Sequence, residues 1–426
     1  MAAGRPRGRP PCVTTPEAPT QKLYWDDPFA TAFEAQARVS TFQGRPSLVL
    51  DRTLFYPEAG GQLADRGTLV VASNEGATEI AIVDVQVDDA GVIHHLRDEA
   101  APALVPFAGV EPVRGEIERA RRRDHMAQHT SQHMLSRALL DMAKAATVSA
   151  RLGATSCTID IDVPQVDEGA LARAEDLVNA VIRDDVTVRQ LFPTDEELAS
   201  LTLRRAPKVS KGIRVIEVEN FDVTPCGGTH CTRTGQIGVV RVVGVERYKG
   251  KIRVSFHAGA RALADMRDKE QALTRLAREL TCGPLDVGTA VERLRAESKG
   301  RSEALSSLRG ELVSLLTDRA WAELPPKEGG TLVALLREGD DLPMLRALAG
   351  GLAARPDVVA LLASIDRDTR DLLVVVQRGA QARFDCGAWF KAAKAQGARG
   401  GGNSERAEGR FPPAYDFDAL VRSIQV

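Results

Sequence analysis

The stretch DHMAQHTSQHML, residues 124–135, places three of the chain's seven histidines four residues apart, at His125, His129 and His133. Apolar residues at helical spacing, with no proline or internal glycine, predict one long helix over residues 115–146. On such a helix, residues four apart share one face and lie about 6 Å apart along the axis. The spacing alone leaves two interpretations open: a metal-binding helix, or a histidine stripe that faces water.

A second cluster favours the metal. The segment FDVTPCGGTHCTRTGQIG lies between two predicted strands, and its two consecutive glycines permit a tight loop that turns Cys226 and His230 toward the same side. Nitrogen and sulfur ligands suit zinc, and His129 and His133 would complete a set of four. Because the two clusters are far apart in the sequence, only folding can unite them. This indicates a zinc centre inside a larger domain and not a zinc finger.

The sequence leaves the role of such a zinc open. Four protein ligands usually close a structural site, whereas a catalytic zinc keeps one position for water or substrate. Either one of the four ligands binds loosely, or the zinc organises the pocket while other groups activate the water. The neighbouring Cys231 is interpreted as a buried thiol outside the site.

Composition predicts a folded protein of two or three domains, since 426 residues exceed one comfortable core. The six cysteines are scattered, which fits a reducing cytoplasm better than a secreted disulfide scaffold. No apolar run is long enough for a membrane span. The first residues, MAAGRPRGRPPCVTTPEAPT, lack the apolar stretch of a secretory signal and are interpreted as a disordered tail, with a nucleic-acid-binding arm as the alternative.

The pattern of helical and strand-like segments predicts an α+β fold. Two charged helical segments, separated by a Gly-Pro turn at residues 283 and 284, indicate a helical hairpin or coiled-coil spacer, and the glycine-rich segment 395–410 is predicted to be a loop. The expected organisation is a disordered tail (1–22), a small β-barrel (23–105), a zinc-containing α+β core (106–258), the helical spacer (259–325) and a small α/β domain (326–426).

Positive charge is concentrated in one segment. Residues 201–261 hold twelve basic residues against four acidic ones, although the whole chain has a formal net charge of −2. Such an excess is typical of a surface that binds a polyanion, and a merely solvated face is the alternative.

The two metal motifs, HTSQH (129–133) and CGGTH (226–230), resemble the signature of the alanyl-tRNA synthetase editing domain, which stands alone in the AlaX-type alanyl-tRNA editing proteins. The segment LFYPEAGGQLADRG (54–67) resembles the family's glycine-rich motif, and GIRVIEVENFD, TGQIG and KIRVSFHAGARAL stand where the family has their counterparts. The resemblance covers about residues 24–265 and identifies residues 106–258 as the editing core.

The C-terminal part adds to this resemblance. A helical spacer followed by a glycine-rich α/β module is similar to the DHH-associated domain of alanyl-tRNA synthetase and of the longer AlaX-type proteins. The run Gly400, Gly401 and Gly402 is a reduced version of the usual one, so nucleic-acid contact and a plain flexible turn both stay open for it. A homodimer through this region is a further expectation.

The resemblance implies a zinc-dependent hydrolase that supports translational fidelity by deacylating mischarged tRNA(Ala), chiefly Ser-tRNA(Ala), with Gly-tRNA(Ala) possible. Its implied zinc ligands are His129, His133, Cys226 and His230, which leaves His125 as a structural or RNA-facing neighbour. About a hundred residues precede the histidine helix, too few for a class II aminoacylation domain, so no ATP-dependent ligase activity is expected.

Substrate contacts are expected from three places. The resemblance points to Gly60, Gly61 and Gln62 near the bound end of the substrate, with a plain barrel turn as the alternative for the two glycines. Thr229 and the amides of Gly227 and Gly228 are candidates for substrate or oxyanion contacts, or for a purely structural loop. The phosphates of the acceptor stem would be met by Lys249, Lys251 and Arg253.

Two other functions compete with this interpretation. One is a zinc hydrolase of other aminoacyl esters or small amides, which would act on substrates that lack tRNA. The other is a zinc-stabilised RNA-binding protein without catalysis, which a chelator would unfold and which would deacylate nothing.

Overall fold

The computed structural model describes residues 19–73, 76–98, 109–207, 212–323, 330–367, 369–395, 397–413 and 415–425. The chain divides into two compact units, Met1–Leu273 and Thr274–Val426, and the division falls within helix α5 (Gly259–Glu279). Most of the predicted tail, residues 1–18, lies outside the described residues. Among the described residues, none of the helices combines the length and the apolar composition that a membrane crossing needs.

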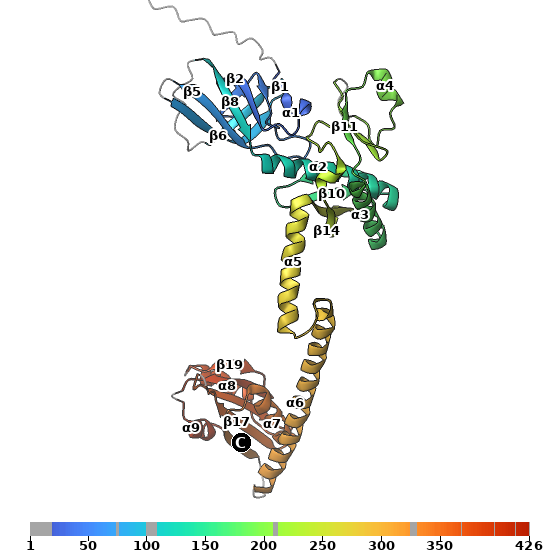
Figure 1. Ribbon diagram of the computed structural model, residues 1–426. Coiled ribbons are helices and arrows are strands. Elements are labelled where there is room, and N and C mark those ends of the chain that lie inside the picture. Colours follow the sequence, from blue (N-terminus) through green and yellow to red (C-terminus); the bar gives the residue numbers. More distant parts are fainter. Residues whose placement is uncertain are drawn as a thin grey trace, which may run out of the picture. The chain divides into compact units, whose positions relative to one another are not determined.

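A closed barrel forms the first part of unit 1 and confirms the predicted β-barrel (Figure 1). Alternating buried and exposed residues, as in β2 (Ala32–Phe42) and β8 (Val110–Ile117), place one side of each strand in the barrel core. The strands follow the closed order β2 (Ala32–Phe42), β3 (Arg45–Leu50), β7 (Ile93–Arg97), β6 (Gly76–Val87), β5 (Gly67–Ser73) and β8 (Val110–Ile117).

The barrel differs from the sequence-based boundaries at both ends. Strand β8 pairs with both β2 and β5 and so closes the barrel, although it lies beyond the predicted boundary at residue 105. At the other end, Thr20 is buried and accepts a hydrogen bond from the Ile93 amide, so the ordered chain begins before residue 23. The short strand β1 (Gln21–Lys22) pairs with β4 (Arg52–Thr53) and leads into helix α1 (Leu23–Asp26).

The rest of unit 1 is built around helix α2 (Arg119–Ala143), whose middle is buried on all sides from His125 to Ser136. This burial excludes the water-facing histidine stripe. The helix starts after β8 and ends at Lys144, which adopts the left-handed conformation, so it is shorter at both ends than predicted.

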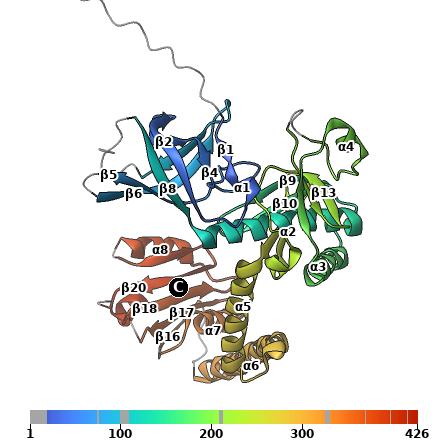
Figure 2. The same cartoon turned by 45° about the horizontal axis from the view of Figure 1, so that its top comes forward.

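Two sheets and further helices surround α2 (Figure 2). Asp167 caps helix α3 by accepting a hydrogen bond from the Ala170 amide, and α3 buries one apolar face in the same core as α2. The four-stranded sheet has the order β14 (Val240–Tyr248), β15 (Lys251–Ala258), β10 (Cys157–Ile161) and β9 (Thr147–Leu152). The three-stranded sheet has the order β11 (Val188–Leu191), β12 (Val215–Val218) and β13 (Asp222–Pro225), and the helices are α3 (Glu168–Arg183), α4 (Asp195–Ser200) and the 3-10 turn η1 (Thr234–Ile237).

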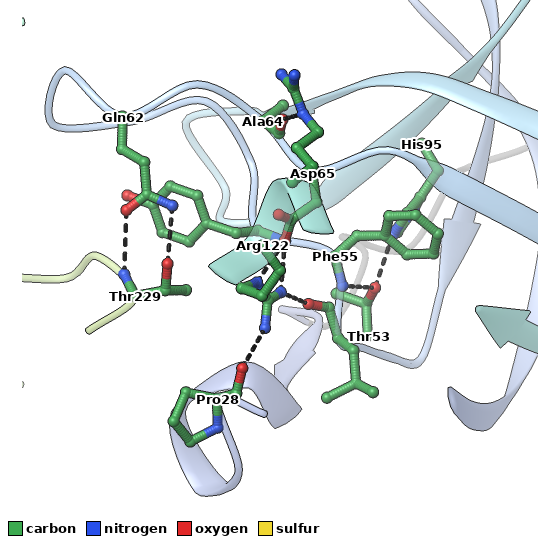
Figure 3. Close-up of polar contacts among 12 residues, drawn as sticks. Pro28, Thr53, Phe55, Gln62, Ala64, Asp65, His95, Arg122 and Thr229 are labelled. Atoms are coloured by element: carbon green, nitrogen blue, oxygen red, sulfur yellow. Dashed lines mark hydrogen bonds and ion pairs between the residues drawn. The ribbon is translucent and has the colours of Figure 1, made fainter. Parts of the chain in front are cut away.

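Two arginines at the start of α2 attach the helix to the barrel loop that carries the GGQ sequence. Arg121 donates to the Ala64 carbonyl at 2.8 Å, and the buried guanidinium of Arg122 donates to the carboxylate of Asp65 and to the carbonyls of Pro28 and Leu54 (Figure 3). Both Arg122 and Asp65 have only 1% of their side chains exposed. Loss of one partner would leave a buried charge uncompensated, so this ion pair fixes the helix against the loop.

Unit 2 contains a five-stranded mixed sheet with apolar clusters on both of its faces, as the predicted small α/β domain requires. Asp341, Asp385 and Asp416 cap the N termini of three helices with their side-chain oxygens. The strands follow the order β16 (Thr331–Glu338), β17 (Val358–Ile365), β18 (Leu372–Arg378), β20 (Arg406–Phe411) and β19 (Arg399–Gly402). The helices are η2 (Pro284–Asp286), α6 (Val287–Glu323), α7 (Leu342–Leu352), α8 (Cys386–Lys394) and α9 (Phe417–Arg422).

The glycine-rich segment 395–410 is not the loop that the sequence predicted. Gly400, Gly401 and Gly402 belong to strand β19, which pairs with β20 in a hairpin at the sheet edge. A Cβ on Gly400 would lie 2.2 Å from the Glu408 carbonyl oxygen, and one on Gly402 would lie 2.1 Å from that of Arg406. Close approach of the two strands therefore requires these glycines, and a plain flexible turn is excluded.

Candidate metal centre

Four side chains from two distant segments meet in the interior of unit 1. Helix α2 supplies His129 and His133, and the loop after β13 supplies Cys226 and His230, with all candidate ligand atoms within 4.8 Å of one another. The Sγ atom of Cys226 lies 3.4 Å from Nε2 of His129 and 3.4 Å from Nε2 of His230. A tetrahedral zinc would hold sulfur and nitrogen about 3.5 Å apart, so the spacing fits this ion.

The surroundings of His133 point most directly to a cation. Its side chain is 1% exposed, and within the described part of the chain neither ring nitrogen has a hydrogen-bond partner. The nearest acidic atom, Oδ2 of Asp222, lies 3.9 Å from Nδ1, and Asp222 is itself bonded by Arg204 and Thr224. A buried imidazole without partners is unfavourable, and coordination of a metal would satisfy it.

Gln62 fixes the orientation of His129. Its Oε1 lies 2.7 Å from Nδ1 of His129 and accepts the Nδ1 proton, which leaves the Nε2 lone pair directed at the cluster. The same Oε1 accepts from the Thr229 amide at 3.2 Å, while Nε2 of Gln62 donates to the Thr229 hydroxyl at 2.9 Å (Figure 3). One amide thus connects the barrel loop, helix α2 and the cysteine loop.

His230 is oriented in the same manner by a threonine on α2. Thr130 donates its hydroxyl hydrogen to the Met126 carbonyl at 2.8 Å, so its oxygen accepts from Nδ1 of His230 at 3.3 Å. The Cys231 amide donates to the same oxygen at 3.0 Å. These bonds leave Nε2 of His230 free to face Cys226.

Burial sets the protonation of the four groups. It lowers the pKa of His129 to about 3 and holds the pKa values of His133 and His230 well below their usual range, with nearby arginines and neighbouring histidines acting in the same direction. The imidazoles are therefore neutral at pH 7 and can act as ligands. Burial raises the pKa of the Cys226 thiol, although Arg214 and the Gly228 amide oppose the rise. A bound cation would favour the thiolate.

The cysteine loop is held by Arg214 and depends on one of its glycines. Arg214 donates through Nη1 to the carbonyls of Cys226 and Gly228, at 3.0 and 2.8 Å, and through Nε to Gln190. A Cβ on Gly228 would lie 2.1 Å from the ring of His129, whereas a Cβ on Gly227 would meet nothing within 4 Å. Only Gly228 must be a glycine for lack of space, and the sequence could not distinguish it from Gly227 in this respect.

A cavity of about 690 Å³ opens onto the cluster, and His129 and Cys226 line it while His133 and His230 lie behind. Gly60 and Gly61 also line it, with positive φ angles of 60° and 86°. A Cβ on Gly61 would lie 2.6 Å from the Ala150 carbonyl oxygen. The close packing of the glycine turn against this part of the cavity wall therefore requires a glycine at position 61.

Gly227 and Gly228, for which the sequence predicted substrate or oxyanion contacts, also line this cavity, whereas the other predicted contact residues do not. Gln62 and Thr229 are fully buried and bonded to each other, Gln62 is also bonded to His129, and neither residue lines the cavity. Arg253 makes two hydrogen bonds to Asp160, at 2.7 and 3.0 Å, and lines a separate cavity.

Lys249 lies in the turn between β14 and β15, and Lys251 lies 3.9 Å from Asp162. The buried His125 has its pKa lowered to about 4, chiefly by burial, and stands outside the four-residue group. Lys208 and Lys211 of the basic segment lie outside the described residues.

The sequence matches two described families. Residues 213–255 match the threonyl and alanyl tRNA synthetase second additional domain, and residues 19–106 match the class II (A) tRNA synthetases. The first of these segments runs through Arg214 and the cysteine loop, and the second covers most of the barrel with its glycine-rich turn.

Similar proteins are alanine–tRNA ligases of archaea. The protein of Halorubrum lacusprofundi is 35% identical over 340 residues, which are 78% of this chain and 35% of that protein. The protein of Pyrococcus abyssi is 28% identical over 95% of this chain and 43% of its own length, and that of Pyrobaculum neutrophilum is 31% identical over 95% and 44%. The chain thus spans between about a third and somewhat less than half of the length of these relatives.

Replacing Gln62 by alanine should weaken metal binding without unfolding the barrel. The change removes the acceptor for Nδ1 of His129 and both partners of Thr229, and loss of such a supporting bond typically costs about 10- to 100-fold in metal affinity. Zinc affinity measured by competition with a chromophoric chelator checks this. Gln36→Ala, on the exposed face of β2, is the matched control, and equal affinities for the two variants would contradict the role of Gln62.

Proposed function

Because the chain is a homologue of a segment of the alanine–tRNA ligases and carries the second additional domain that threonyl and alanyl tRNA synthetases share, we propose that it deacylates mischarged tRNA(Ala). The principal substrate would be Ser-tRNA(Ala), with Gly-tRNA(Ala) as a second one. The observation that carries the proposal is the four-donor cluster, of which His129 and Cys226 line a cavity large enough for the end of an aminoacylated nucleotide.

Zinc is the metal that this donor set fits best, because three imidazoles and one thiolate combine nitrogen and sulfur in a compact buried site. When bound, zinc would supply Lewis acidity toward the ester carbonyl or toward a nearby water. Whether four ligands close the site or one of them yields to substrate is a property of the bound state, and His129 and Cys226 are the two ligands that face the cavity.

The chain's own groups would position the ester beside the cluster. Arg214 is 7% exposed, lines the cavity and is fixed by its bonds to the cysteine loop, so it places a positive charge beside Cys226. A cation held in a poorly solvated wall stabilises negative charge that develops on a carbonyl oxygen. The glycines at positions 60 and 61 let the bound end of the substrate approach the backbone closely.

Thr147 is the group that supports a preference for serine. Thr147 lines the cavity, and its hydroxyl oxygen is buried without a hydrogen-bond partner among the described residues. A buried hydroxyl of this kind gains a bond from the serine hydroxyl of Ser-tRNA(Ala), whereas the alanine methyl group leaves it unpaired. Discrimination in favour of the mischarged substrate would follow from this difference.

Contacts with the body of the tRNA are proposed for the basic residues of this region. Arg205 is exposed and lines the cavity, where a phosphate could reach it. Lys249, Lys251 and Arg253 remain proposed phosphate contacts on the β14–β15 hairpin, with Arg253 also stacked 3.5 Å from the ring centre of Tyr248.

A deacylation assay with Ser-, Gly- and Ala-tRNA(Ala) tests the proposal. The wild-type chain should hydrolyse the seryl ester much faster than the alanyl ester, and Cys226→Ala should lose about 100-fold or more, since a metal's contribution amounts to several kcal/mol. Cys231→Ala, which changes a buried thiol outside the cluster, is the control and should retain activity. Equal hydrolysis of all three esters, or full activity of Cys226→Ala, would refute the proposed function.

Thr147→Val tests the origin of specificity, because valine keeps the shape and removes the hydroxyl. The ratio of kcat/KM for Ser-tRNA(Ala) to that for Ala-tRNA(Ala) should fall by about 10-fold or more, since a lost hydrogen bond in a buried site costs about 1–3 kcal/mol. Zinc content should not change. An unaltered ratio would assign serine recognition to another group.

A further inference from the structure

Aromatic side chains gather at the cavity that faces the metal cluster, although aromatic residues make up only 4% of the chain. Tyr24, Trp25 and Tyr56 line the cavity, and their rings form a connected set with centroid distances of 5.9 and 5.4 Å. Phe192 continues the set, 6.0 Å from Trp25, with 58% of its surface exposed. Tyr24 and Tyr56 are buried, so Trp25 and Phe192 form the accessible part.

Trp25 is fixed in place by the loop that carries the metal ligand. Its indole N–H donates to the carbonyl of Gly227 at 3.0 Å, one residue beyond Cys226. The backbone carbonyl of Trp25 accepts a hydrogen bond from the side-chain nitrogen of Gln190. The side-chain oxygen of Gln190 accepts one from Arg214. A flat ring held at a fixed distance from the reaction centre offers a stacking surface that needs little ordering on binding.

The charges around this ring suit a nucleotide. The Nζ atom of Lys22 lies 4.5 Å from the Trp25 ring centre, and Lys22, Arg205 and Arg214 all line the cavity. None of the described residues that line it is acidic. An aromatic face beside cationic side chains is the arrangement that binds a base and its phosphate without reading sequence.

We propose that Trp25 is the stacking surface for the terminal base of the tRNA, an adenine, with Lys22 and Arg205 at the adjoining phosphate. This inference rests on the proposed function and names the part of the substrate that the cavity mouth recognises. Stacking of the base on Trp25 sets the terminal ribose beside the Gly227 carbonyl, so the ester on that ribose is directed toward His129 and Cys226. Phe192 extends the apolar surface at the outer edge.

Fluorine NMR of the full chain labelled with 5-fluorotryptophan tests this directly, with adenosine 5′-monophosphate as the probe. The chain has three tryptophans, so Trp321 and Trp389 of unit 2 serve as internal references, and Trp25→Phe assigns the remaining resonance. The Trp25 resonance alone should shift and saturate on titration. Ribose 5-phosphate, which lacks the base, should leave it unchanged.

Affinity for adenosine 5′-monophosphate should fall about 5- to 150-fold in Trp25→Ala, since stacking on an aromatic side chain contributes about 1–3 kcal/mol per base. Trp25→Phe keeps an aromatic face without the bond to Gly227 and should retain most of the affinity. The zinc content of both variants shows whether a loss of affinity comes from lost stacking or from damage to the loop that carries Cys226. The titration of the labelled wild-type chain still tests the proposal if a variant loses its metal.

Three results would overturn the proposal: no shift of the Trp25 resonance, an equal shift with ribose 5-phosphate, or equal movement of all three resonances. Failure of this inference and of the proposed function can be told apart. Deacylation of Ser-tRNA(Ala) without a nucleotide-dependent shift refutes the stacking role alone. A saturable shift without deacylation refutes the proposed hydrolysis and leaves a nucleotide site.

Discussion

The side-chain amide of Gln62 is the connection on which the site depends. Its oxygen accepts hydrogen bonds from Nδ1–H of His129 and from the backbone amide of Thr229. Its nitrogen donates a hydrogen bond to the Thr229 hydroxyl. Because Gln62 belongs to the barrel loop, His129 to helix α2 and Thr229 to the cysteine loop, three segments far apart in the sequence share one buried group. All of these hydrogen bonds form together only when the three segments are in place, which makes the arrangement cooperative.

The supporting structure holds these three segments by polar contacts of the same buried kind. Arg122 and Asp65 join α2 to the barrel loop, and Arg214 joins the cysteine loop to the sheet that precedes it. The apolar core under α2 then fixes the face that the histidines present. These contacts fix the positions of the candidate metal ligands, and burial keeps the imidazoles of His129 and His133 neutral.

Spacing in the sequence revealed the two pairs of donors, because residues four apart on a helix share one face and two consecutive glycines permit a tight loop. It could not separate His125 from His129 and His133, since all three have the same spacing and only the position of the cysteine loop distinguishes them. The α+β fold and the barrel were predictable from alternation of apolar residues. Strand β8 was missed because it contains a proline and a glycine and runs almost directly into α2.

Other functional features depend on burial that no local pattern reports. Gln62 was predicted to meet substrate, and the sequence did not reveal its bonds to His129 and Thr229, which lie 67 and 167 positions away in the chain. The unpaired hydroxyl of Thr147 and the fixed ring of Trp25 became visible only when the cavity was defined. The hairpin of β19 and β20 was hidden by its glycines, which depress strand propensity while permitting close pairing.

We propose that His129, His133, Cys226 and His230 together bind one zinc ion. X-ray absorption at the zinc edge, recorded on the purified full chain loaded with one equivalent of zinc, tests it most directly. We expect three nitrogen neighbours at about 2.0–2.1 Å and one sulfur neighbour at about 2.3 Å, with imidazole scattering in the outer shell. A first shell without sulfur, or one made of water and carboxylate oxygens alone, would contradict it.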